Sequence, residues 1–132
     1  MSAFEGVHAL IIEDDQVSID VLQNLLNQLS VSTTVLVGNH QIADHISAIA
    51  RPDVIFLDLE MPGYNGYEVL ELLRTDAEFD GVPIVAYTTH ISHMNHARAA
   101  GFDSFLGKPV QRYSFADNLY RILNGESVWE AP

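Results

Sequence analysis

Five short apolar runs, separated by longer segments of mixed polarity, set the strongest limit on how this chain can fold. Unbroken apolarity, as in Ala9–Ile12 and Val54–Leu57, is typical of strands that are buried on both faces of a parallel sheet. Such a sheet needs helical connections that cover its faces. The runs that predict strands are Val7–Ile12, Thr33–Val37, Asp53–Leu57, Val82–Tyr87 and Asp103–Gly107.

The segments between these runs carry the spacing of amphipathic helices, with apolar residues three and four positions apart. Pro52 is expected to close the second helix, because the residue before a proline disfavours helical geometry. Gly125 is placed to cap the last helix, with Arg121 near its C-terminal dipole. Strand and helix alternate five times, which favours an α/β fold with a parallel sheet covered on both faces. The predicted helical stripes are Val17, Val21, Leu22, Leu25, Leu26 and Leu29; Ile42, Ile46, Ile49 and Ala50; Val69, Leu70 and Leu73; and Phe115, Leu119, Ile122 and Leu123.

Composition narrows the class of protein. The 132 residues suit one domain. Their formal net charge of −12 disfavours binding to nucleic acid or to an anionic membrane surface. The absence of cysteine excludes disulfides, thiolate zinc sites and cysteine nucleophiles. No signal peptide and no apolar run long enough to span a membrane are apparent, so we expect a soluble cytoplasmic protein.

Polar side chains follow the predicted strands where each one ends. Glu13, Asp14 and Asp15 follow the first strand, Asp58 the third and Lys108 the fifth, while Thr88 and Thr89 follow the fourth. The carboxyl ends of parallel strands share one edge of the sheet, where sites form in this class of fold. Crowded carboxylates raise one another's pKa unless a cation compensates, and Mg²⁺ favours such oxygen ligands. A carboxylate nucleophile, a metal and a cationic clamp are the parts that phosphoryl transfer needs.

Four motifs in order carry a resemblance to a known family. They are Leu10–Asp15, Val54–Gly63 with Asn65–Gly66 just beyond, Pro83–Thr88 and Phe105–Pro109. With them the chain resembles the response-regulator (CheY-like) receiver domains of two-component phosphorelay signalling, from about Val7 to Asn124. The resemblance implies a flavodoxin-like, doubly wound, three-layer α/β fold with five parallel strands in the order 2-1-3-4-5 and five helices. We expect this domain over residues 1–125, with a short tail over residues 126–132 and no output domain.

The resemblance also implies roles for individual residues. Asp58 resembles the phosphoacceptor, which takes a phosphoryl group from a phosphohistidine on a sensor histidine kinase or a His-phosphotransfer protein. Asp14 would bind Mg²⁺ directly and Glu13 through metal-bound water, with further ligands from the Asp58 carboxylate and the Glu60 backbone carbonyl. Lys108 would pair with Asp58 before transfer and with the phosphoryl oxygens after it.

The same resemblance implies a two-state response. The Thr88 hydroxyl would bond a phosphoryl oxygen and draw its loop inward, and the Phe105 ring would fill the space left behind. The face that changes would be the fourth helix, fifth strand and fifth helix, from about His90 to Asn124. The partner on that face would be a downstream protein, and the chain itself would be a monomer or a weak homodimer. We expect a signalling switch, not an enzyme with an external substrate.

Some residues also have simpler interpretations. Asp15 lies where an N-cap of the first helix is expected. The His90, His93 and His96 trio is spaced too loosely for a zinc helix and fits a solvated surface better. Trp129 in the tail is expected to pack back onto the domain. The alternative for the whole chain is a receiver-like interaction module that works without phosphorylation.

Overall fold

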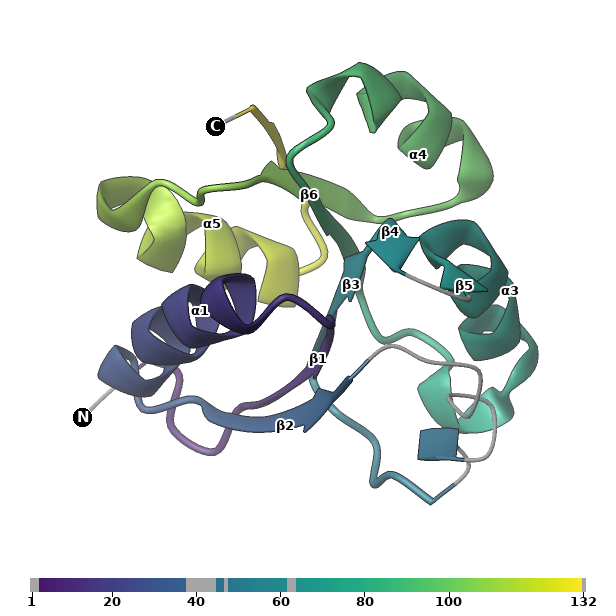
Figure 1. Ribbon diagram of the computed structural model, residues 1–132. Coiled ribbons are helices and arrows are strands. Elements are labelled where there is room, and N and C mark those ends of the chain that lie inside the picture. The colour runs from purple at the N-terminus through teal and green to yellow at the C-terminus, as the bar shows by residue number, and fades with distance from the viewer. Residues whose placement is uncertain (1–2, 38–44, 47, 62–63, 132) are drawn as a thin grey trace.

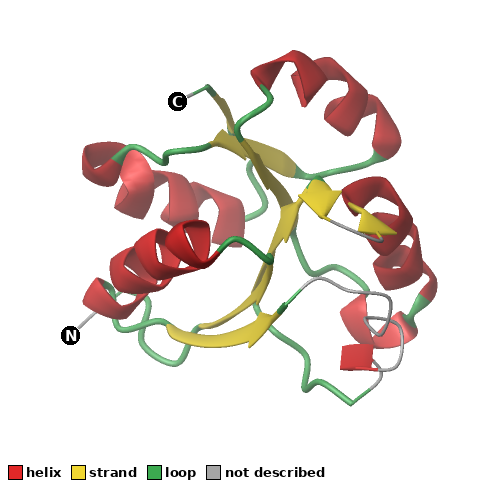
Figure 2. Ribbon diagram, viewed as in Figure 1, coloured by secondary structure: helices red, strands yellow, loops and turns green. Residues whose placement is uncertain are grey.

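One parallel sheet lies at the centre of the computed structural model, which describes residues 3–37, 45–46, 48–61 and 64–131. Helices cover both faces of this sheet, with α1 and α5 on one face and α3 and α4 on the other (Figures 1 and 2). The strands are β1 (His8–Ile12), β2 (Ser32–Leu36), β3 (Val54–Asp58), β6 (Ile84–Thr88), β7 (Ser104–Gly107) and β8 (Trp129–Glu130). The described helices are α1 (Gln16–Gln28), α3 (Gly66–Thr75), α4 (Met94–Ala100) and α5 (Arg112–Leu123), with 3-10 turns η1 (Ala77–Phe79) and η2 (Ile91–His93).

The predicted three-layer, flavodoxin-like α/β architecture is confirmed, with two differences in detail. The order β2-β1-β3-β6-β7 is the predicted order 2-1-3-4-5, and every neighbouring pair is parallel. The prediction of five strands was wrong by one, because β8 adds a sixth strand beside β7. Four α-helices are described instead of five, since much of the segment predicted as the second helix lies outside the described residues. Among the helices described, none has both the length and the apolarity for a membrane crossing.

Two apolar layers hold the helices on the sheet. Phe56 of β3 packs in the layer on the α1 and α5 side, while its neighbour Leu57 packs in the layer on the α3 and α4 side. This alternation follows from the pleat, which turns successive side chains to opposite faces. It explains why β3 is apolar without interruption until Asp58. Each fully buried side chain of this kind contributes about 1.5–3 kcal/mol relative to an exposed one.

The predicted stripe of α1 is only partly correct. The helix buries Leu22, Leu25 and Leu26, but Val17 is 70% exposed, and Ile19 occupies the core-facing position instead. Each residue of a helix advances by about 100°, so Ile19 lies in line with Leu22 and Leu26 while Val17 falls on the far side. The valine at the start of the helix therefore belongs to the surface.

The tail over residues 126–132 was predicted as an extension beyond the last helix, and the structure places its described part in the sheet. Gly125 has a φ of +87°, which suits the predicted glycine cap after a helix. The chain then turns back, and the Phe105 N–H donates to the carbonyl of Val128 at 2.8 Å. Trp129 is half-buried and packs against the layer on the α3 and α4 side, so its predicted packing onto the domain is confirmed.

A two-stranded hairpin, β4 (Glu60–Met61) with β5 (Tyr64–Asn65), carries the chain from β3 to α3. The hairpin brings Gly66, the first residue of α3, against the end of β3, where its N–H donates to the Leu59 carbonyl at 2.8 Å. A Cβ atom at Gly66 would lie 2.6 Å from the Asp58 carbonyl oxygen and 2.7 Å from the Leu59 Cα. Only glycine permits this approach without a shift of the backbone.

We therefore expect Gly66→Ala to destabilise the fold by about 1–3 kcal/mol, because the new methyl group must displace backbone rather than a side chain. Chemical unfolding measures the change. Glu71→Ala, on an exposed position of the same helix, is the control and should change stability much less. Equal stability of the Gly66→Ala variant and the wild type would contradict the close approach.

Candidate functional site

The carboxyl ends of four strands open into one polar cleft of about 240 Å³. The loop after β1, the ends of β3 and β6, and the residue after β7 all contribute side chains. The topology explains this convergence, because β1, β3, β6 and β7 are parallel neighbours and end at the same edge. The residues that line the cleft are Glu13, Asp14, Asp15, Ser18, Asp58, Glu60, Thr88, Thr89, His90 and Lys108.

Three carboxylates form the acidic centre of the cleft. Glu13, Asp14 and Asp58 each offer one oxygen, and these oxygens lie within 4.8 Å of one another. Glu13 and Asp58 are buried and Asp14 is half-buried. A set of oxygen ligands at this spacing, with one side open, fits a hard divalent cation such as Mg²⁺. No other described group of His, Asp or Glu side chains meets the same geometric condition.

Glu13 and Lys108 form the closest ion pair of the cleft. The Lys108 Nζ lies 2.5 Å from the Glu13 Oε2 and 3.7 Å from the Asp58 Oδ1. The other oxygen of Glu13 accepts from the N–H groups of Asp14 and Asp15, both at 3.1 Å. The sequence prediction paired Lys108 with Asp58, whereas in the structure Glu13 holds the ammonium group and Asp58 is its more distant partner.

The environment of Asp58 disfavours the charged form of its carboxyl group. Burial raises its pKa to about 7, and the Glu13 carboxylate adds to the rise, while the Lys108 ammonium group opposes it. The Glu60 N–H also donates to the Asp58 Oδ1 at 3.2 Å, which favours the charged form. A carboxylate with a pKa near neutrality in a cleft is the kind of group that takes part in chemistry.

Thr88 is buried at the end of β6 and directs its hydroxyl toward the following loop. The Thr88 Oγ1 accepts from the His90 N–H at 3.2 Å, and the Thr88 carbonyl accepts from the Lys108 N–H at 2.8 Å. These two bonds connect the loop that leads to α4 with the residue that closes β7. Thr89 is exposed and lines the cleft.

Phe105, the other predicted switch residue, is buried in the layer on the α3 and α4 side. It pairs in register with Ala86 of β6 and Trp129 of β8. It is on the strand that leads to Lys108 but is not among the residues that line the cleft.

Two contacts at the cleft were not predicted from the sequence. The His90 Nε2 lies 3.0 Å from the Glu60 Oε2, so these two exposed side chains meet beside the cleft. The Lys108 Nζ lies 4.8 Å from the centre of the Tyr87 ring, within reach of a cation–π contact. Both pairs are distant in sequence, and only the strand order indicates that they meet.

The simpler interpretations of Asp15 and of the histidines agree with the geometry. The Asp15 side chain caps α1 by accepting from the Ser18 N–H at 3.0 Å, and its bonds to Ser18 hold the pKa of its carboxyl below the usual value. His93 stacks beside His90, whereas His96 packs on the Tyr67 ring. The His90 and His93 rings thus lie beside each other, whereas His96 has a different neighbour, Tyr67.

The burial of Asp58 predicts how stability depends on pH. Its pKa is raised from 3.8 to about 7 in the folded chain, so the stability that the protonated form contributes is fully present below about pH 4 and is lost progressively as pH rises to about 7. Without divalent cations, Asp58→Asn should therefore be more stable than the wild type at pH 8, by on the order of 1 kcal/mol or more, and this difference should be clearly smaller at pH 5.

Unfolding in EDTA at the two pH values measures this difference, and Mg²⁺ should stabilise the wild type more than the variant. Asp80→Asn is the control, because Asp80 is exposed and lies outside the cleft. A difference between Asp58→Asn and wild type that is the same at pH 5 and pH 8 would contradict a raised pKa at Asp58.

Comparison with known proteins agrees with this geometry. The family model of the response regulator receiver domain matches residues 9–120. The chain is 32% identical to Protein RcaC of Microchaete diplosiphon over 91% of its length, and 25% identical to the polar-differentiation response regulator DivK of Brucella anthropi over 83%. It spans 19% of RcaC and 13% of a rice protein described as Probable histidine kinase 2, but 90% of DivK.

Solved structures show the same fold. The receiver domain of the sensor histidine kinase PA1611 from Pseudomonas aeruginosa, described with a magnesium ion coordinated in its active-site cleft, superposes with a TM-score of 0.76 at 27% identity, covering 90% of this chain and 98% of that one. The chemotaxis response regulator CheY4 of Vibrio cholerae gives a TM-score of 0.76 at 23% identity, over 88% of this chain and 98% of that one. The family model covers most of the chain and the fold agrees with it. The chain belongs to the response regulator receiver domains of two-component signalling.

Proposed function

We propose that this receiver accepts a phosphoryl group on Asp58 from a phosphohistidine and passes the signal on through a protein contact. The observation that carries the proposal is the convergence of Glu13, Asp14, Asp58 and Lys108 in one cleft. The donor would be a sensor histidine kinase or a His-phosphotransfer protein. The chain would turn over no external substrate, and it would act in the cytoplasm.

Asp58 is the proposed nucleophile. A carboxylate oxygen attacks the phosphorus atom, and the bond from phosphorus to the imidazole nitrogen of the donor breaks. That nitrogen keeps the electron pair, and the donor leaves as neutral imidazole because its other ring nitrogen carries a proton. Burial favours this reaction, because a poorly hydrated carboxylate loses little solvation as it attacks. The pKa of about 7 means that the reactive, charged form is available at neutral pH once a cation is near.

Lys108 is the proposed clamp for the transferred group. Its ammonium group is held by Glu13 at 2.5 Å and lies 3.7 Å from Asp58, so it is already beside the position where new phosphoryl oxygens would appear. Preorganised positive charge of this kind stabilises the charge that develops during transfer. Glu13 thus serves as a positioning residue for Lys108 in addition to its proposed part in metal binding.

The carboxylates of Glu13, Asp14 and Asp58, with the backbone carbonyl of Glu60, are the groups that would hold Mg²⁺. When bound, the ion supplies positive charge that neutralises the crowded carboxylates and the incoming phosphoryl oxygens. The magnesium ion coordinated in the active-site cleft of the PA1611 receiver domain supports this proposal.

Thr88 and Phe105 are the proposed switch. The Thr88 hydroxyl is buried at the strand end beside Asp58, since Asp58 pairs in register with Tyr87. A phosphoryl oxygen on Asp58 would accept a hydrogen bond from this hydroxyl, whose Oγ1 already accepts from the His90 N–H, so His90 and its loop would move with Thr88. A shift of the loop that leads into α4 follows, and the predicted output face is α4, β7 and α5.

We keep residues 1–125 as the receiver domain in this proposal, with a downstream protein as the partner and no direct contact with nucleic acid or membrane. The chain would be a monomer or a weak homodimer. The alternative is a receiver-like module that binds its partner without phosphorylation, and reaction with a small phosphodonor separates the two.

Incubation with Mg²⁺ and a small phosphodonor should add one phosphoryl group to the wild type, as seen in the intact mass. Asp58→Asn should lose this reaction completely, because the amide cannot attack. Asp80→Asn, the exposed control, should react like the wild type. Failure of the wild type to react with the donor or to bind beryllofluoride would favour the phosphorylation-independent module.

Thr89 gives a prediction about the lifetime of the phosphoryl group. Its side chain lines the mouth of the cleft and restricts the access of water to Asp58, so Thr89→Ala should dephosphorylate severalfold faster. Thr75→Ala, which removes the same atoms from the exposed end of α3, is the control. Radiolabel decay after removal of the donor measures the rate, and an unchanged or slower decay in Thr89→Ala would exclude steric shielding by this residue.

A further inference from the structure

The last strand of the sheet is held by side chains as well as by backbone. Just before β8, the Val128 carbonyl accepts from the Phe105 N–H of β7 at 2.8 Å, and the Val128 N–H donates to the Ser104 hydroxyl at 2.9 Å. Ser104 is fully buried, so this hydroxyl depends on the tail for its partner. The strand is nevertheless only two residues long.

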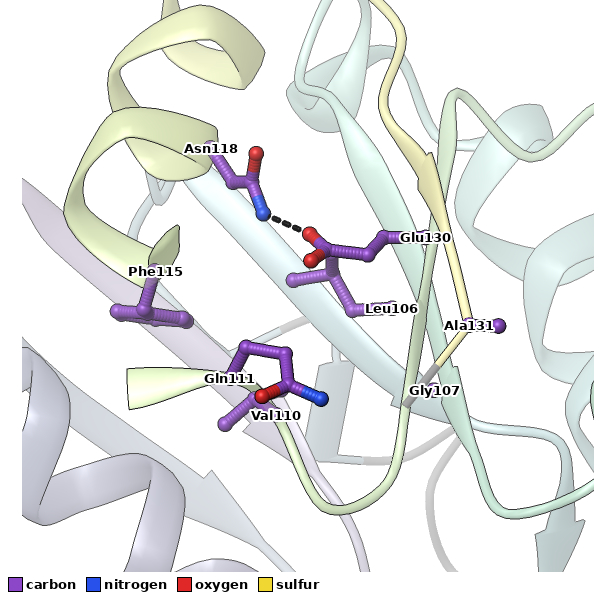
Figure 3. Close-up of a pocket in the computed structure, with 8 residues that line it drawn as sticks. All are labelled: Leu106, Gly107, Val110, Gln111, Phe115, Asn118, Glu130 and Ala131. Atoms are coloured by element: carbon purple, nitrogen blue, oxygen red, sulfur yellow. Dashed lines mark hydrogen bonds between the residues drawn. The ribbon is translucent and has the colours of Figure 1, made fainter. Parts of the chain in front are cut away.

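Two successive side chains of β8 each meet a different helix. The guanidinium carbon of Arg98, on α4, lies 4.4 Å from the centre of the Trp129 ring, which is a cation–π geometry. On the opposite face of the strand, the carboxylate of Glu130 accepts from the Ser114 hydroxyl at 3.2 Å and from the Asn118 amide, both on α5. Figure 3 shows the Glu130 side chain directed at Asn118.

The fit between the tail and its surroundings is close. The cavity that remains beside Glu130 measures only about 10 Å³ and is lined by residues of β7, α5 and the tail itself (Figure 3). Asn118 is more than nine-tenths buried, and its amide would lose its carboxylate partner if the tail left. We call Arg98, Ser104, Phe105, Ser114 and Asn118 the edge site.

The connection between α5 and β8 permits the tail to leave. Residues 124–127 are exposed, and Gly125 supplies a positive φ of +87° there, a conformation that glycine adopts without strain. The family model ends at residue 120, before this segment begins. Detachment of the tail would remove Val128, which is buried in the layer on the α1 and α5 side, so a competing segment must also fill that apolar position.

We propose that the edge site is a binding site for an extended peptide segment of a partner protein, one that adds a strand to β7 and carries an aromatic residue followed by an acidic one. The chain's own tail is its tethered occupant. Backbone pairing would supply affinity, as in other cases of strand addition, and Arg98 and Asn118 would read the two side chains. A tethered occupant has an effective concentration in the millimolar range. A partner peptide must therefore compete with the tail, or bind when the contacts between the tail and the edge site are weakened.

The test uses a labelled peptide that copies residues 126–132 and measures its binding by fluorescence anisotropy. The full chain with Trp129→Ala and Glu130→Ala keeps the edge site but loses both tail anchors, so it should bind the peptide at least about tenfold more tightly than the wild type does. Adding Asn118→Ala to this variant should reverse the gain. Adding Tyr113→Ala, on the exposed side of α5 where this residue is 86% exposed, should leave binding unchanged.

No binding to the double variant up to about 1 mM peptide, or binding that Asn118→Ala does not reduce, would overturn the proposal. Equal binding to the wild type and the double variant would also overturn it. A second measurement avoids the double variant: Trp129 is the only tryptophan in the chain, so its quenching by acrylamide reports on the tail directly. Glu130→Gln should raise that quenching severalfold and strengthen peptide binding, and an unchanged value would mean that Glu130 does not hold the strand.

Discussion

The pairing of Glu13 with Lys108 is the interaction on which the cleft depends. Glu13 is fully buried, and its carboxylate is paired with the ammonium group 2.5 Å away, whereas removal of either partner would leave an unpaired buried charge, which is strongly unfavourable. The pair joins the loop after β1 to the end of β7, across the two strands that lie between them. It therefore fixes the separation of the outer walls of the cleft, and Asp58 on the central strand lies between those walls.

The sequence predicts where the polar side chains of the cleft gather better than it predicts which of them form ion pairs. The ends of apolar strands can be read from the sequence, and parallel order then brings Asp14, Asp58 and Thr88 to one edge. Which carboxylate Lys108 approaches depends instead on side-chain directions and distances of a few ångströms. These are settled by packing, and neither strand spacing nor residue type contains that information.

The tail shows a different limit of prediction. Trp129–Glu130 is too short to carry a strand pattern, and strand formation there depends on partners far away in the sequence, such as Phe105 and Asn118. Local propensity cannot reveal contacts of that kind. The exposed Val17 has a different cause: at about 100° per residue it lies on the side of α1 opposite to Ile19, Leu22 and Leu26, which the helical period alone indicates.

The outermost position of β8 also has a consequence for how molecules of this protein meet. A sheet border that offers a long row of free N–H and carbonyl groups invites a neighbouring chain to continue it, which leads to aggregation. Here the strand at the border is β8, which has only two residues. The carboxylate of its second residue, Glu130, already accepts a hydrogen bond from α5. The row available to a neighbour at this border is correspondingly short, which disfavours continuation of the sheet by a second molecule on this side.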